Sequence, residues 1–296
     1  MDKKKTFSTQ AVKDFLNKTG FPFEWKMERL LRQKNWMIGN KFYLDLDENK
    51  KREVDIIAAK TINEIDIFLT IECKYSKKDS WIFFSPNKRI HRYYGYFICS
   101  PLPDIDSKKI ITSHLRIFNR AEPTAVSFKT YDNYKEKQSN DSEITDALYK
   151  VVKALIYCYS HFSTPSKRQV YFPVILFSGP IFCASYSDRL RVKKTNYIQF
   201  PFEFESEAYI SKKEVAEDSL LDEGGIGFSG SLLSSDYDEE TKIREIEGIK
   251  KAYKGLFNKH LIEFVSGYKF GAYLDQLETE IGSIDTNLWP VKSEKS

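Results

Sequence analysis

Residues 52–74 read REVDIIAAKTINEIDIFLTIECK, and this stretch decides the fold. Two β-rich runs, 52–59 and 66–74, flank Asn63-Glu64, which predicts an antiparallel hairpin with Asp55 directly opposite Glu72. Because Asn-Glu is not a favoured two-residue turn, a small bulge or a longer loop is the alternative. A slip of the pairing by two residues would leave the same faces matched.

Side chains of the two runs alternate between the faces of this hairpin. One face collects apolar residues suited to burial: Val54, Ile56, Ala58, Ile67, Leu69, Ile71 and Cys73. The other face collects Asp55, Glu72 and Lys74. Since like charges facing each other destabilise a sheet, the two carboxylates need a compensating cation. Oxygen ligands of this kind, completed by the Cys73 backbone carbonyl, suit Mg²⁺ or Mn²⁺.

Hydrolysis of a phosphodiester requires the same groups. A divalent metal polarises the phosphoryl oxygen and binds the attacking water, and a cation stabilises the charge that develops. Lys74 follows Glu72 by two residues and projects from the same side of its strand. We expect it to orient or deprotonate the water, or to stabilise the transition state.

The segments 53–57 (EVDII) and 71–74 (IECK) resemble the two halves of the PD-(D/E)xK nuclease motif. The resemblance covers residues 21–76 directly and implies a restriction-endonuclease-like α/β fold with an αβββαβ core and a central mixed sheet. It also implies Mg²⁺-dependent cleavage, with Asp55 and Glu72 as metal ligands. Val54 stands where the family usually has proline.

The family commonly adds a glutamate from the helix before the first strand. An apolar stripe at helical spacing (Phe23, Met27, Leu30 and Leu31) predicts that helix. Glu28 beside the stripe is the preferred fourth catalytic residue, and Glu24, one turn earlier, is the competing choice.

A basic and aromatic segment follows the second strand. Its cations Lys77, Lys78, Lys88, Arg89 and Arg92 are interleaved with Trp81, Phe83, Tyr93 and Tyr94. Such a mixture can contact phosphates and stack on bases, so these cations are the predicted nucleic-acid contacts. A solvated loop anchored by aromatics is the alternative, and a second basic cluster at 189–194 is a weaker candidate.

The rest of the chain divides by its patterns. Residues 1–210 are the predicted nuclease core, with an irregular, proline-rich insertion at about 77–140. A helix over 143–161 and strands over 169–178, 181–186 and 198–204 complete it, with a turn at Gly179-Pro180. An acidic, Gly- and Ser-rich linker is expected over 211–240 and a helical extension over 241–296.

Composition narrows the function class. The chain has 296 residues, of which 41% are hydrophobic, and its four cysteines lie far apart in the sequence. Its formal charge of +4 is too small a surplus of positive charge to indicate nucleic-acid binding by itself. We expect a cytoplasmic protein with reduced thiols, no secretory signal and no membrane span. The Gly225-x-Gly227-x-x-Gly230 pattern follows no strand, and the four histidines show no ligand spacing, so neither a nucleotide cofactor nor a histidine site is expected.

These patterns together predict a Mg²⁺- or Mn²⁺-dependent endonuclease acting on DNA, in restriction, defence or repair. A homodimer is expected for double-strand cutting by a single site. Two alternatives stay open: an RNA-directed nuclease, and a non-catalytic nucleic-acid-binding or assembly module on the same fold.

Overall fold

The computed structural model describes residues 8–16, 18–86, 97–99, 124–162, 167–206, 243 and 259–284. Four α-helices and one short 3-10 helix have these bounds: α1 Thr9–Leu16, α2 Phe21–Gln33, α4 Ser142–Phe162, η2 Gly267–Lys269 and α7 Phe270–Gly282. The strands are β1 Met37–Ile38, β2 Phe42–Asp45, β3 Lys50–Glu53, β4 Ile56–Ile62, β5 Ile65–Lys74, β6 Asp79–Phe84, β7 Phe97–Cys99, β8 Ser127–Asp132, β9 Lys137–Gln138, β10 Arg168–Phe177, β11 Ile181–Tyr186, β12 Leu190–Thr195, β13 Tyr197–Glu203 and β14 Lys259–Ser266.

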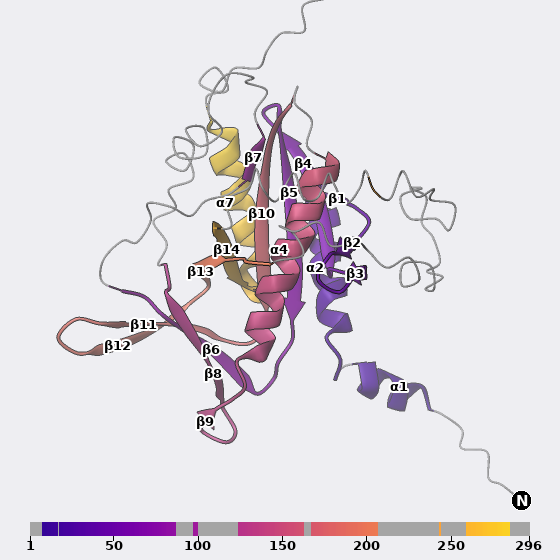
Figure 1. Cartoon of the computed structure of the whole chain (residues 1–296). Helices are drawn as coiled ribbons and strands as arrows, with labels where there is room; N and C mark the ends of the chain where they lie inside the picture. The colour runs from indigo at the N-terminus through magenta and orange to yellow at the C-terminus, as the bar shows by residue number, and fades with distance from the viewer. Residues whose placement is uncertain are drawn as a thin grey trace, which may run out of the picture.

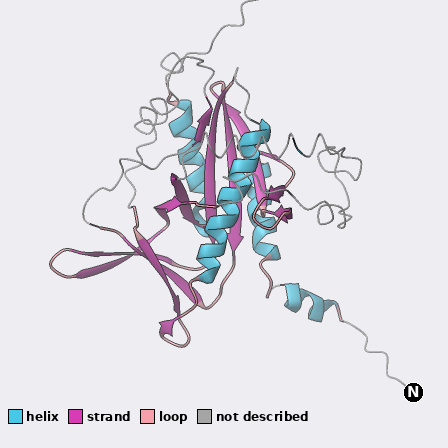
Figure 2. Cartoon of the chain, viewed as in Figure 1, coloured by secondary structure: helices cyan, strands magenta, loops and turns pink. Residues whose placement is uncertain are grey.

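The fold is a mixed α/β arrangement around a seven-stranded sheet (Figures 1 and 2). Its strand order is β1-β4-β5-β10-β14-β13, and β7 also pairs with β10. A five-stranded sheet, β12-β11-β6-β8-β9, and a two-stranded ribbon, β2-β3, complete the described strands. The expectation of a central mixed sheet is confirmed.

The β4–β5 hairpin has the predicted register. Ile56 pairs with Ile71 and Ile62 with Ile65, and Asp55 directly precedes the first of these pairs. Asn63 and Glu64 both have positive φ, 49° and 61°, as a type I′ turn requires. The bulge or longer loop is therefore absent, and the turn accepts a non-glycine residue at its second position.

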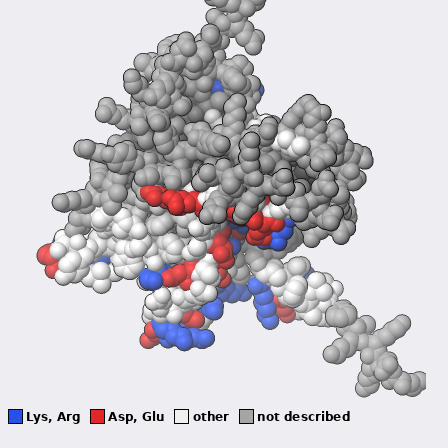
Figure 3. Space-filling model, in the orientation of Figure 1, with Lys and Arg blue, Asp and Glu red and all other residues white. Residues whose placement is uncertain are grey.

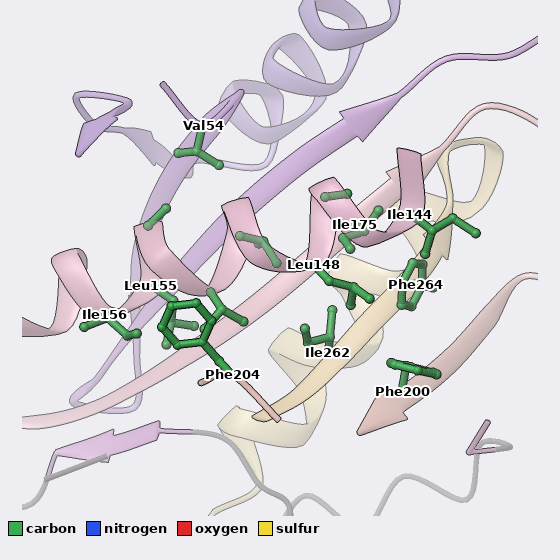
Figure 4. Close-up of a cluster of buried hydrophobic side chains, with 14 of the residues drawn as sticks. Val54, Ile144, Leu148, Leu155, Ile156, Ile175, Phe200, Phe204, Ile262 and Phe264 are labelled. Carbon is green, nitrogen blue, oxygen red and sulfur yellow. The ribbon is translucent and has the colours of Figure 1, made fainter. Parts of the chain in front are cut away.

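Apolar residues fill both faces of the central sheet. Helices α2 and α7 cover the face that carries Ile56, Ala58 and Ile71, as the alternation predicts. Helix α4 covers the opposite face (Figure 4). The prediction that Val54 shares a face with Ile56 was wrong. Val54 packs with Ile57 in the cluster of buried residues under α4. Residues 54 and 55 lie between the end of β3 and the start of β4, so the strand alternation does not extend back to Val54.

The expected helical extension over 241–296 contains a central strand. β14 runs parallel to β10, and β10 runs parallel to β5 with Phe177 beside Lys74. Residues 260–266 are all buried, the polar His260, Glu263 and Ser266 among them, because β14 lies inside the sheet and is covered on both faces, so its sequence shows no alternation of polar and apolar residues. Such a run cannot be told from a buried helix by periodicity alone. Within the described part of this region, α7 and η2 are helical, and the region 211–240 lies outside the described residues.

Most of the five-stranded sheet comes from the segment expected to be an irregular insertion. Strands β6, β8 and β9 lie within 77–140, and β11 and β12 join them. The Trp81 ring stacks on Phe177 with centroids 3.8 Å apart, which fixes this sheet to the end of β10. A Cβ on Gly179 would lie 2.6 Å from the Asp79 carbonyl oxygen, so the turn after β10 needs glycine to pass this close to β6.

The helix and strands predicted after residue 142 are confirmed as α4, β10, β11 and β13. No helix among the described residues is long and apolar enough to cross a bilayer.

Candidate functional site

The hairpin and α4 bring four charged side chains together at the C-terminal end of β5. Asp55 precedes β4 and accepts a hydrogen bond from the Cys73 backbone N–H to its Oδ2 at 2.6 Å. Glu72 and Lys74 are on β5, and Lys74 Nζ lies 3.1 Å from Glu72 Oε1. The predicted grouping of Asp55, Glu72 and Lys74 on one side of the hairpin is what the structure has.

Glu72 is the most confined of these groups. It is 2% exposed, and its Oε2 accepts no hydrogen bond from any described residue. Burial raises the pKa of Glu72, and repulsion by Asp55 raises it further, while Lys150 and Lys74 act in the opposite direction. A buried carboxylate oxygen without a donor is costly, so this oxygen is suited to a cation.

Lys150 is the member of the cluster that the sequence analysis missed. Its side chain extends from α4, and its Nζ lies 2.9 Å from Glu72 Oε1 and 3.8 Å from Asp55 Oδ1. Burial alone would lower the pKa of Lys150, but the carboxylates of Glu72 and Asp55 outweigh it and raise that pKa. The sequence carried only a weak signal, because Lys150 lies beside the apolar stripe of α4, where a lysine on an exposed helix face would also stand.

The two lysines of α4 have different partners. Lys153, nearly one turn further on, lies 2.8 Å from Asp45 Oδ1 and 2.7 Å from Asp47 Oδ2. These pairs join α4 to the β2–β3 ribbon, away from Glu72. The Lys150 side chain retains 32% exposure, whereas that of Lys153 retains 9%. Figure 3 shows acidic and basic side chains close together on the described part of the face in view.

Helix α2 contributes Glu24 to the site rather than Glu28. Glu28 Oε1 lies 2.7 Å from Arg32 Nη2 on its own helix, in a surface pair. Burial raises the pKa of Glu24, and Asp55 is the next cause, so Glu24 lies within reach of the charge of Asp55. Lys41 Nζ lies 3.2 Å from Glu24 Oε1 and also pairs with Glu53. The structure therefore favours Glu24, the competing choice, over Glu28.

The donors present fit a hard divalent cation. Asp55 and Glu72 offer carboxylate oxygens, and the carbonyl of Cys73 points to the same strand edge as its N–H, which faces Asp55. No group of three His, Cys, Asp or Glu side chains is arranged to hold a metal within the described ranges. The donors that could hold a cation are thus two carboxylates and one backbone carbonyl, and the buried Glu72 Oε2 has no hydrogen-bond donor among the described residues.

The predicted nucleic-acid contacts are described only in part. Lys77 and Lys78 follow β5 directly, where Lys77 Nζ lies 5.9 Å from the Tyr75 ring centre. The half-exposed Lys78 lies 3.9 Å from Asp132. Lys88, Arg89 and Arg92 fall outside the described residues.

Comparison of the chain with protein-family models, curated proteins and solved structures finds no match, so its function has to be inferred from this site.

Proposed function

We propose that the protein is a divalent-metal-dependent nuclease that hydrolyses phosphodiester bonds of DNA. The observation that carries the proposal is that Asp55 and the buried Glu72 lie close enough for Lys150 to contact both, while one oxygen of Glu72 has no donor among the described residues. Two ammonium groups, from Lys74 and Lys150, lie against the other oxygen. Two carboxylates and a nearby cation are the groups that metal-assisted phosphodiester hydrolysis needs.

The order of elements supports the same proposal. Helix α2, strands β1, β4 and β5, helix α4 and strand β10 follow one another as in the αβββαβ core of PD-(D/E)xK nucleases. β1, β4 and β5 are antiparallel neighbours, and β10 returns parallel to β5 after α4. The five-stranded sheet, most of which is inserted between β5 and α4, and Val54 in place of proline are departures from that pattern.

Each residue of the site has a distinct part in the proposed reaction. Asp55, Glu72 and the Cys73 carbonyl would hold Mg²⁺ or Mn²⁺, which supplies Lewis-acid activation of the phosphoryl group and of water when bound. Lys74 Nζ would orient the attacking water or stabilise charge on the phosphoryl oxygens. Glu24 takes the supporting role expected of a helix glutamate, because it is the α2 carboxylate within reach of Asp55.

Plasmid cleavage tests the proposal. Purified protein should nick supercoiled DNA with Mg²⁺ or Mn²⁺ and not with EDTA, and Asp55→Asn and Lys74→Met should each abolish the nicking. Glu24→Gln should reduce the rate, while the matched variant Glu28→Gln, one turn further along α2, should leave it near wild type. Nicking that survives both Asp55→Asn and Lys74→Met would place the chemistry elsewhere. Faster cleavage of RNA than of DNA would identify an RNA-directed enzyme, and binding to DNA without any cleavage would favour a non-catalytic module.

A further inference from the structure

We infer that Lys150 is a built-in counter-ion, which occupies the space between the two carboxylates until a divalent metal displaces it. The inference rests on the proposed function, because it takes Asp55 and Glu72 as the metal ligands. A residue of α4 would therefore control when the site binds metal.

Geometry separates Lys150 from the other ammonium of the site. Lys150 Nζ lies within 2.9 Å of Glu72 Oε1 and 3.8 Å of Asp55 Oδ1, so it spans both carboxylates. Among the described residues, Lys74 Nζ pairs only with Glu72, at 3.1 Å from its Oε1. A cation that attracts both carboxylates competes most directly with a metal held by both.

The balance of charges in the cluster explains why a metal would displace Lys150. Among Asp55, Glu72, Lys74 and Lys150, the two ammonium groups balance the two carboxylates, so a divalent ion bound there would add two positive charges that these four side chains do not offset. Lys150 can relieve this repulsion by moving out, because its side chain is still 32% exposed at the surface. Lys153 has no such freedom, since two aspartates hold it in a buried position.

A nucleic-acid phosphate would offset part of the same surplus. Metal and nucleic acid should therefore bind cooperatively, and by linkage each should raise the affinity of the other by the same factor. The consequence is a site that binds metal weakly by itself and loads it together with its substrate.

Mn²⁺ binding, measured by titration calorimetry on the full chain without nucleic acid, tests the inference. Lys150→Met should bind Mn²⁺ about tenfold or more tightly than wild type, because a nearby positive charge has been removed. Lys150→Arg should restore the weak affinity, and the exposed Lys137→Met should change nothing. A second titration, with a nuclease-resistant DNA duplex present, should tighten Mn²⁺ binding by wild type more than by Lys150→Met.

The outcomes separate this inference from the proposed function. Equal or weaker Mn²⁺ affinity in Lys150→Met, with clear binding by wild type, would overturn the counter-ion role and leave the metal site standing. Absence of Mn²⁺ binding in both proteins, with and without the duplex, would overturn the metal site itself. Circular dichroism of each variant shows whether the fold is retained.

Discussion

The pKa of Glu72 governs how the site responds to pH. Burial and the neighbouring Asp55 raise this pKa above the ordinary value of 4.5, so the native protein takes up a proton at Glu72 at a higher pH than a free glutamate does. A proton and a metal compete for the same carboxylate. We therefore expect Mn²⁺ affinity to fall as the pH is lowered, at a higher pH than the ordinary value of 4.5 would give. Calorimetry across a pH series would show this, and affinity that stays constant down to 4.5 would contradict it.

The two lysines of α4 should differ in what they contribute to stability. Lys153→Met leaves Asp45 buried beside Asp47 without its cation, which should lower the free energy of unfolding by about 3–5 kcal/mol. Lys150→Met should cost about 1 kcal/mol or less, because its side chain is partly exposed and Lys74 still contacts Glu72. Urea unfolding of both variants gives the comparison. An equal decrease in the free energy of unfolding in both variants would mean that Lys150 has the same structural role as Lys153.

At the scale of single elements, the β4–β5 hairpin was the most predictable part of the molecule. Alternation of apolar and polar residues over 66–74 predicted which residues share a face, and a turn centred on Asn63-Glu64 predicted the register of the two strands. The strand alternation is local, so it could not show that Val54 and Asp55 separate β3 from β4. Nor could it show that α4 lies over Glu72, because the contact from Lys150 spans 78 positions.

The turn of this hairpin offers a stability test. Glu64 has a φ of 61°, a conformation that costs a non-glycine residue about 1 kcal/mol and that glycine adopts freely. Glu64→Gly also loses the exposed pair with Arg168, at 3.0 Å, which is worth little. Glu64→Ala loses the pair and keeps the strain, so Glu64→Gly should be about 1 kcal/mol more stable than Glu64→Ala in thermal or urea unfolding. A less stable glycine variant would refute a type I′ turn at this position.

Longer-range elements were harder to predict for a physical reason. The strand β14 is buried on both faces, so its sequence carries no alternation to separate it from a helix. Glu24 and Glu28 are one helical turn apart, and the sequence alone could not decide which of them approaches Asp55. The pairing of Glu28 with Arg32, four residues along, is a signal that could have favoured Glu24.

At the scale of the whole molecule, the five-stranded sheet extends from the end of the central sheet that carries the site. The Ser76 N–H donates to Ser178 Oγ at 3.0 Å and ties the β5–β6 connection to the β10–β11 connection. The β11–β12 hairpin projects from this sheet (Figure 1), and residues 186–194 are all exposed. Arg189, Arg191, Lys193 and Lys194 give it four cations against the single acidic residue Asp188.

This hairpin should contribute to DNA affinity in the proposed nuclease. Replacing Arg191 and Lys193, which share one face of β12, by alanine should weaken binding to a DNA duplex and reduce its salt dependence by about two phosphate contacts. Mn²⁺ binding should be unchanged. Fluorescence anisotropy at several salt concentrations measures the DNA affinity and its salt dependence. The matched control replaces the exposed Lys135 and Lys137 by alanine. Equal salt dependence in wild type and the Arg191/Lys193 variant would exclude the hairpin from the interface.

The proposed reaction depends on a divalent cation held by Asp55, Glu72 and the Cys73 carbonyl. Crystals of the protein soaked in Mn²⁺ test this most directly, because the anomalous signal identifies the ion without reference to activity. The predicted result is a peak bounded by these three residues, with Lys150 Nζ moved away from Asp55, and its loss in Asp55→Asn. Crystals that show Mn²⁺ only elsewhere, with Lys150 still between the two carboxylates, would contradict the metal site.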